Sequence, residues 1–109
     1  MAKLKAIIKR VDRKDAYTAA VSDSLENLQK FVGGYIEAVT IYRETEDRPG
    51  VVIICNEEGV IQGLPFNCRI GGLPIFGDFL ILGTKGPEFC DVPIAPKLIN
   101  KIIEESKLI

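Results

Sequence analysis

The sequence predicts an α+β domain, built as one mostly antiparallel β-sheet with two helices packed on one face. Residues 25–32 carry apolar side chains at helical spacing and end at Gly33 and Gly34, and a β-branched and aromatic run follows directly at 35–42. A continuously apolar run at 51–55 is typical of a strand in the middle of a sheet. With 109 residues, the chain is expected to form one domain, residues 1–109.

The first part of the chain predicts a hairpin followed by a helix. Residues 3–11 alternate charged and apolar side chains, which indicates a strand with one apolar face. A polar turn at 12–15 leads to a second strand at 17–21. The helix is predicted at about residues 24–33, with Asp23 as its N-terminal cap.

The middle of the chain predicts an antiparallel strand pair. The strands at 35–42 and 51–55 are joined by a charged loop with a Pro-Gly pair, and we expect them to lie side by side. After the turn residues that follow Cys55, Val60 and Ile61 are predicted to add a short third strand.

The last part of the chain predicts an irregular segment, a strand and a helix. Residues 62–76 contain two Leu-Pro pairs and three glycines, which argue against a regular element. The last strand is predicted at 77–83. The terminal helix is predicted at 94–107, with Pro96 in its first turn.

Charge and apolar content limit the classes of partner. The chain has 14 basic and 15 acidic residues, so it lacks the basic excess of a protein that grips duplex nucleic acid, and we expect no nucleic-acid partner. Basic residues do crowd positions 3–14, which predicts either a charge-protected edge strand and turn or a local basic surface. No apolar run approaches the ~20 residues that span a bilayer, so no membrane partner is expected.

The cysteines and the absence of histidine limit the chemistry. Cys55, Cys68 and Cys90 form no CxxC pair, and no signal peptide is evident, which favours reduced thiols in a cytoplasm. Without histidine there is no Ser-His-Asp triad, no Cys-His pair and no histidine-containing metal site. We therefore expect a protein that is not an enzyme and has no catalytic residue, metal or cofactor.

The strongest candidate for a binding site is the segment 64–69. The guanidinium of Arg69 suits a phosphate, and Phe66 offers a ring on which a base can stack. Asn67 lies between them in the same segment. The alternative is that Asn67 and Arg69 tie a long loop to backbone carbonyl groups.

A second candidate lies at the end of the strand 51–55. Asn56 and Glu57 begin a polar turn there, and binding residues are common where a rigid strand ends. The alternative is a plain tight turn in which Asn56 bonds to the nearby backbone.

Four linked motifs resemble a family of small uncharacterised domains found in phages, mobile elements and Gram-positive bacteria. They begin at Leu25 (LxxLQxxVGGYIE), Cys55 (CNEEG), Gly63 (GLPxNxR) and Gly77 (GxFLxxG). The resemblance covers about residues 3–86 and stops before the terminal helix.

The family is in turn similar to phage anti-defence proteins of the anti-Thoeris type, which sequester nucleotide immune signals. That resemblance implies a homo-oligomeric binding protein that holds a cyclic ADP-ribose derivative or a cyclic oligonucleotide without cleaving it, in the cytoplasm of a host cell. The alternative is a protein-interaction module that inhibits a host protein through the charged loop 43–50 and the terminal helix.

Overall fold

The computed structural model describes residues 3–108. These residues form eight strands and two helices. In chain order they are β1 (Lys3–Lys9), β2 (Tyr17–Ser22), α1 (Leu25–Val32), β3 (Ile36–Tyr42), β4 (Gly50–Asn56), β5 (Phe66–Ile70), β6 (Leu73–Phe76), β7 (Phe79–Lys85), β8 (Glu88–Cys90) and α2 (Pro96–Ser106).

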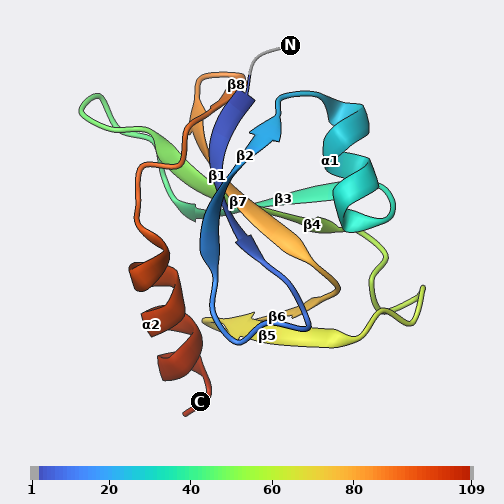
Figure 1. The fold of residues 1–109 in the computed structure, drawn as a ribbon. Coiled ribbons are helices and arrows are strands. Elements are labelled where there is room, and N and C mark those ends of the chain that lie inside the picture. Colours follow the sequence, from blue (N-terminus) through green and yellow to red (C-terminus); the bar gives the residue numbers. More distant parts are fainter. Residues whose placement is uncertain (1–2, 109) are drawn as a thin grey trace.

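The main sheet is antiparallel throughout and has the strand order β2-β1-β7-β4-β3, with β8 paired to β7 (Figure 1). The predicted hairpin of β1 and β2 and the predicted pair of β3 and β4 both form. Strands β5 and β6 make a separate hairpin. The predicted α+β class with a mostly antiparallel sheet is confirmed.

Both faces of the sheet are apolar, because neighbouring residues of its central strands point to opposite sides. Ile7 belongs to one buried cluster and Ile8 to the other, and the residues of β4 and β7 alternate in the same way. The expectation that β1 has only one apolar face is wrong, since Ile7 is completely buried. A sheet with two apolar faces needs a cover on each side.

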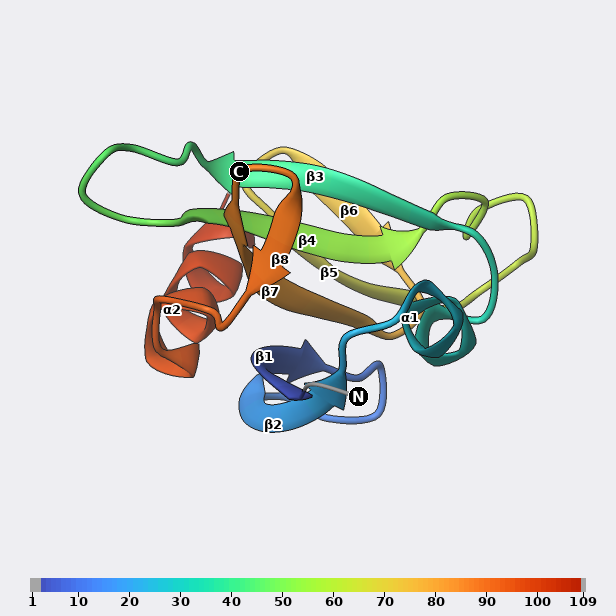
Figure 2. The ribbon, with the colours of Figure 1, turned by 90° about the horizontal axis from the view of Figure 1, so that it is seen from above.

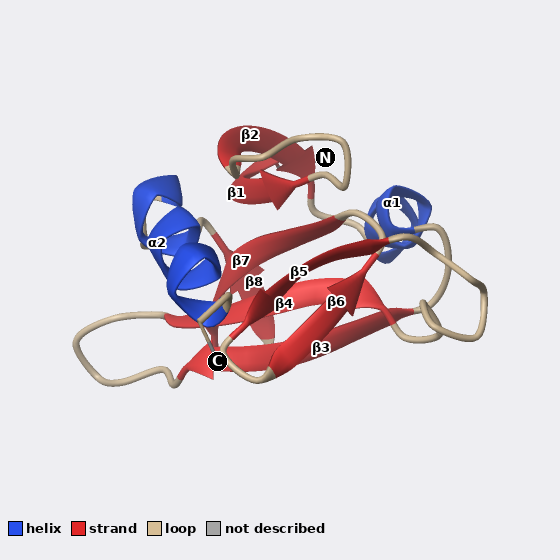
Figure 3. Ribbon diagram, turned by 90° about the horizontal axis from the view of Figure 1, so that it is seen from below, coloured by secondary structure: helices blue, strands red, loops and turns tan. Residues whose placement is uncertain are grey.

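The two helices provide those covers from opposite faces, and the prediction that both pack on one face is wrong. Leu28 and Val32 of α1 pack in the cluster that contains Ile8. Ile99 and Ile103 of α2 pack in the other cluster. Figure 2 shows the helices on opposite sides of the molecule. The β5–β6 hairpin shares the α2 face and packs over it (Figure 3).

Local chemistry explains where α1 begins and ends. The hydroxyl oxygen of Ser24 accepts a hydrogen bond from the backbone N–H of Asn27 at 3.2 Å, so Ser24 is the cap and the prediction of Asp23 is wrong. Gly33 ends the helix at φ 81°, a conformation that glycine adopts at little cost.

Two predictions after β4 are wrong. Val60 and Ile61 lie in a turn with 69% and 82% of their surface exposed, not in a third strand. The segment 62–76 contains the β5–β6 hairpin, and Pro74 is compatible with it because, within the part of the chain that the structure describes, β6 pairs with β5 alone. The terminal helix forms as predicted, with Pro96 at its start. No helix within residues 3–108 is long and apolar enough to cross a membrane.

Candidate functional site

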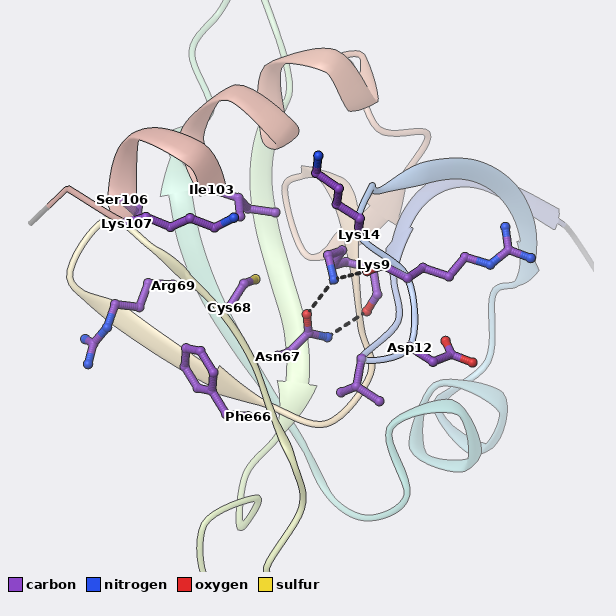
Figure 4. Close-up of a pocket in the computed structure, with 12 residues that line it drawn as sticks. Lys9, Asp12, Lys14, Phe66, Asn67, Cys68, Arg69, Ile103, Ser106 and Lys107 are labelled. Carbon is purple, nitrogen blue, oxygen red and sulfur yellow. Dashed lines mark hydrogen bonds between the residues drawn. The ribbon is translucent and has the colours of Figure 1, made fainter.

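A cavity of about 500 Å³ opens between the β1–β2 turn, strand β5 and the end of helix α2 (Figure 4). Five of its lining residues are cationic and one is acidic. We call it the basic cavity. It is lined by Lys9, Val11, Asp12, Arg13, Lys14, Phe66, Asn67, Cys68, Arg69, Ile103, Ser106 and Lys107.

The wall of the basic cavity contains a buried lysine. Lys9 follows Ile7 onto the α2 face of the sheet and is only 4% exposed. Its ammonium donates hydrogen bonds to the carbonyl oxygens of Arg10 (2.8 Å) and Arg13 (2.6 Å) and to Oδ1 of Asn67 (2.9 Å). All three acceptors are neutral, and within residues 3–108 no carboxylate forms an ion pair with Lys9. A buried charge without a counter-charge favours an anion nearby.

Asn67 holds the strands around this lysine together. Its side-chain Nδ2 donates to the carbonyl oxygens of Lys9 (3.0 Å) and Gly77 (2.9 Å), while its Oδ1 accepts from Lys9 Nζ. Both N–H groups of the amide are therefore engaged within the chain. Asn67 lies in the cavity wall, but its contacts are those of the structural tie that the sequence left as an alternative.

Arg69 and Phe66 lie at the rim. Among residues 3–108 the guanidinium of Arg69 has no hydrogen-bond or ion-pair partner, and it points away from the centre formed by Lys9 and Asn67 (Figure 4). Phe66 is 52% exposed, and its ring meets the ring of Phe76 edge-on at 5.5 Å between centroids. Both side chains are accessible to a ligand that enters the cavity.

The remaining charged residues differ in how they contribute to the inner surface of the cavity. Asp12, the one acidic lining residue, points away from the Lys9–Asn67 centre, whereas the Lys107 side chain runs toward it (Figure 4). Lys107 pairs with Glu104 at 3.2 Å at the surface. The guanidinium of Arg13 lies over the ring of Tyr17 at 5.2 Å, so Arg13 contributes mainly through its carbonyl oxygen.

Cys68 lies in the wall between these cations. Burial raises the pKa of its thiol to about 11, although Lys9 and Lys107 oppose the rise. At neutral pH Cys68 is therefore a protonated thiol, and the thiol form is a poor nucleophile.

The other two predicted site residues lie elsewhere. Asn56 and Glu57 border a second cavity of about 280 Å³, which we call the acidic groove. It is lined by Glu37, Cys55, Asn56, Glu57, Glu58, Gly59, Val60, Ile61, Leu73, Pro74, Ile75 and Phe76. The five predicted site residues thus divide between two cavities.

Asn56 is a structural residue in this groove. It is 6% exposed, and its Nδ2 donates to the carbonyl oxygen of Val32 (3.1 Å) and to Oε1 of Gln62 (3.0 Å). Its Oδ1 accepts from the backbone N–H of Glu58 at 2.7 Å, the turn contact that the sequence offered as the alternative. Glu57 is exposed, and its carboxylate has no ion-pair partner within residues 3–108.

The sequence interpretation missed four of the five cations of the basic cavity. Lys9, Arg13 and Lys14 belong to the basic stretch 3–14, and Lys107 follows the last helix. The sequence feature that could have indicated Lys9 is its spacing of two residues from the apolar Ile7, which places both side chains on the same, buried face of β1. Nothing local in the sequence places Lys107 beside residues 66–69.

The fold and the cavity together define a small α+β domain with a cation-lined pocket. The family model described as "Domain of unknown function (DUF3846)" matches residues 4–105, and the chain belongs to this family. The match continues through most of α2, so the expectation that the family resemblance stops before the terminal helix is wrong. No curated protein and no solved structure matches the chain.

Proposed function

We propose that the chain is a binding protein that sequesters a nucleotide-derived signal, either a cyclic ADP-ribose derivative or a cyclic oligonucleotide, in the basic cavity. The observation that carries this proposal is the buried ammonium of Lys9, which has only neutral acceptors and no carboxylate partner within residues 3–108. A phosphate in the cavity supplies the missing counter-charge.

The lining residues suit such a ligand. Arg69 offers a planar pair of donors to phosphate oxygens, and the ammonium groups of Lys14 and Lys107 add positive charge. The exposed ring of Phe66 at the rim is a surface on which a base stacks. The cavity volume, about 500 Å³, is within the range of about 300–1,000 Å³ that small-molecule sites occupy.

Binding without cleavage is part of the proposal. The thiol of Cys68 is protonated at neutral pH, and within residues 3–108 Asp12 is the only carboxylate in the lining. General acid–base cleavage uses two groups with separated pKa values, and the lining supplies no such pair of carboxylates.

The resemblance to phage anti-defence proteins supports a proposal for where the protein acts and in what oligomeric state. The protein acts in the cytoplasm of a host cell against an immune signal, as a homo-oligomer in which a second copy closes the open side of the cavity. Light scattering with and without ligand measures the assembly.

Calorimetry with cyclic ADP-ribose isomers and cyclic oligonucleotides tests the proposal. We expect one of them to bind and to be recovered unchanged by mass spectrometry. Lys14→Glu should weaken binding at least about tenfold, because it reverses a charge in the cavity. Lys30→Glu is the matched control, since Lys30 is exposed on α1 at the opposite face of the sheet. The proposal is wrong if no member of the panel binds, or if both variants weaken binding equally.

A further inference from the structure

Strand β3 ends the main sheet, and one of its sides has no partner strand among the described residues 3–108. The carbonyl oxygen of Tyr35 accepts from the backbone N–H of Glu57 at 2.9 Å, which fixes the direction of the alternating backbone groups. The N–H and C=O groups of Ile36, Ala38 and Thr40 therefore point to the free edge. No turn, cap or side-chain hydrogen bond within residues 3–108 uses them.

This edge lacks the usual protection against an added strand. β3 contains no lysine, arginine or proline, and Glu37 is its only charged residue. Strand β6, in contrast, carries Pro74. A bulge between Thr40 and Tyr42 interrupts β3 near its end and confines regular pairing to residues 36–40.

The acidic groove lies beside this edge. Glu37 belongs both to β3 and to the groove lining, so a strand added to β3 passes the groove. The carboxylates of Glu37, Glu57 and Glu58 line the groove, and no lysine or arginine does. Its apolar walls include Val60 and Ile61, whose exposure is high for apolar side chains and is typical of a contact surface.

We propose that the free edge of β3 and the acidic groove together bind an extended peptide segment of another protein with alternating apolar and basic side chains. The segment adds a strand by bonding to the backbone of Ile36, Ala38 and Thr40, and every second side chain faces the groove. A lysine or arginine there reaches the carboxylates of Glu57 and Glu58.

The charges distinguish this partner from a second copy of the chain. If β3 paired with β3 of a second copy, the side chain of the second Glu37 would enter the same acidic face of the sheet. Like charges in neighbouring strands are destabilising, so the edge favours a basic segment over its own sequence.

Fluorescence anisotropy with three labelled eight-residue peptides tests the proposal on the unchanged protein. The first alternates valine and lysine, the second alternates valine and glutamate, and the third repeats the first with every second amide N-methylated. We expect the first to bind saturably and the other two at least about tenfold more weakly, because they lose the ion pairs or the strand hydrogen bonds. N-methylation changes the peptide alone, so misfolding of the protein cannot produce that loss.

Two variants locate the bound peptide. Glu57→Lys should weaken the valine–lysine peptide by about threefold or more, whereas Glu88→Lys, on the exposed end of β8, should leave it unchanged. Equal binding of all three peptides would overturn the proposal. The proposal would also be overturned if the peptide-free protein were a dimer and Ala38→Pro converted it to a monomer. That result would show that the β3 edge binds a second copy of the chain. The nucleotide assay concerns the other cavity, so the two proposals fail independently.

Discussion

Lys9 and Asn67 are joined by two hydrogen bonds across 58 positions of sequence, one between their side chains and one from the Asn67 side chain to the Lys9 backbone. Lys9 Nζ donates to Asn67 Oδ1 at 2.9 Å, and Asn67 Nδ2 donates to the carbonyl oxygen of Lys9 at 3.0 Å (Figure 4). The pair joins the end of β1 to β5, and a second bond from Asn67 reaches Gly77. The side-chain amide of Asn67 therefore connects three segments in the wall of the basic cavity: the end of β1, strand β5 and the residues around Gly77.

Asn67→Ala should lower the stability of the protein. The change removes three hydrogen bonds and leaves the Lys9 ammonium with one acceptor fewer, which costs about 2–3 kcal/mol in the free energy of unfolding. Urea denaturation measures the loss. Asn67→Asp should lose less, because it keeps an acceptor for Lys9 and makes that acceptor a charge. An alanine variant as stable as the parent protein would show that the amide does not hold the cavity.

Arg69→Ala should leave stability within about 0.5 kcal/mol of the parent, because the side chain is exposed and has no partner among residues 3–108. If Arg69 binds a phosphate, the same variant should lose about 1.5–3 kcal/mol of affinity for the nucleotide that calorimetry identifies, and Arg69→Lys should recover part of it. Two measurements on Arg69→Ala distinguish a binding role from a structural one: the thermal midpoint without ligand, and the affinity at a temperature well below that midpoint. A large thermal loss with unchanged affinity would remove Arg69 from the site.

The elements that the sequence predicted well have local signals. Helix α1 ends at Gly33 because a left-handed residue follows the last turn, and β4 is buried on both sides because all of its apolar residues are consecutive. The terminal helix begins at Pro96, a residue suited to a first turn.

The features that the sequence did not predict depend on contacts between distant segments. The lysines beside Ile7 suggest a solvated strand face, yet α2 and the β5–β6 hairpin cover that residue. Pro74 argues against a strand by local rules, but among the described residues β6 pairs with β5 alone, and a strand with one free side tolerates proline.

The residues of the candidate site also divide into those that the sequence predicted and those that only the fold brings in. Phe66, Asn67 and Arg69 come together because they are close in the chain, whereas Lys9 and Lys107 join them only through the fold. Asn56 and Glu57 lie in the acidic groove instead. The turn that follows β4 and the basic cavity are at different positions on the α2 face of the sheet.

Gly83→Ala should destabilise the protein strongly. A Cβ atom at this position would overlap the carbonyl oxygen of Asp91 and lie 2.9 Å from Sγ of Cys90, and the first of these is backbone that cannot turn away. The cost of such overpacking is about 1–3 kcal/mol, measured by thermal or urea denaturation. Gly72→Ala is the control, because a Cβ there meets nothing within 4 Å. Similar losses in the two variants would contradict the packing of β8 against β7.

The buried thiols should make stability fall as the pH rises through the alkaline range. Burial raises the pKa of Cys55 to about 11 from the ordinary 9.0, and the carboxylate of Glu37 adds to the rise. The pKa of Cys68 also rises to about 11. At pH values well below 9.0, the ordinary pKa of a thiol, both thiols are protonated in the folded and unfolded chains, so they have no effect on the pH dependence there.

Between pH 9 and 11 the unfolded chain releases these protons first, which favours unfolding and lowers the free energy of unfolding. Urea denaturation at intervals across this range measures the fall. Replacing Cys55 and Cys68 together with alanine or valine should flatten the curve, whatever it does to stability at pH 7. The partly exposed Cys90 is the control: its pKa is raised by burial as the largest cause, and Cys90→Ser should leave most of the alkaline slope in place. An unchanged slope in the double variant would mean that groups other than these two thiols cause it.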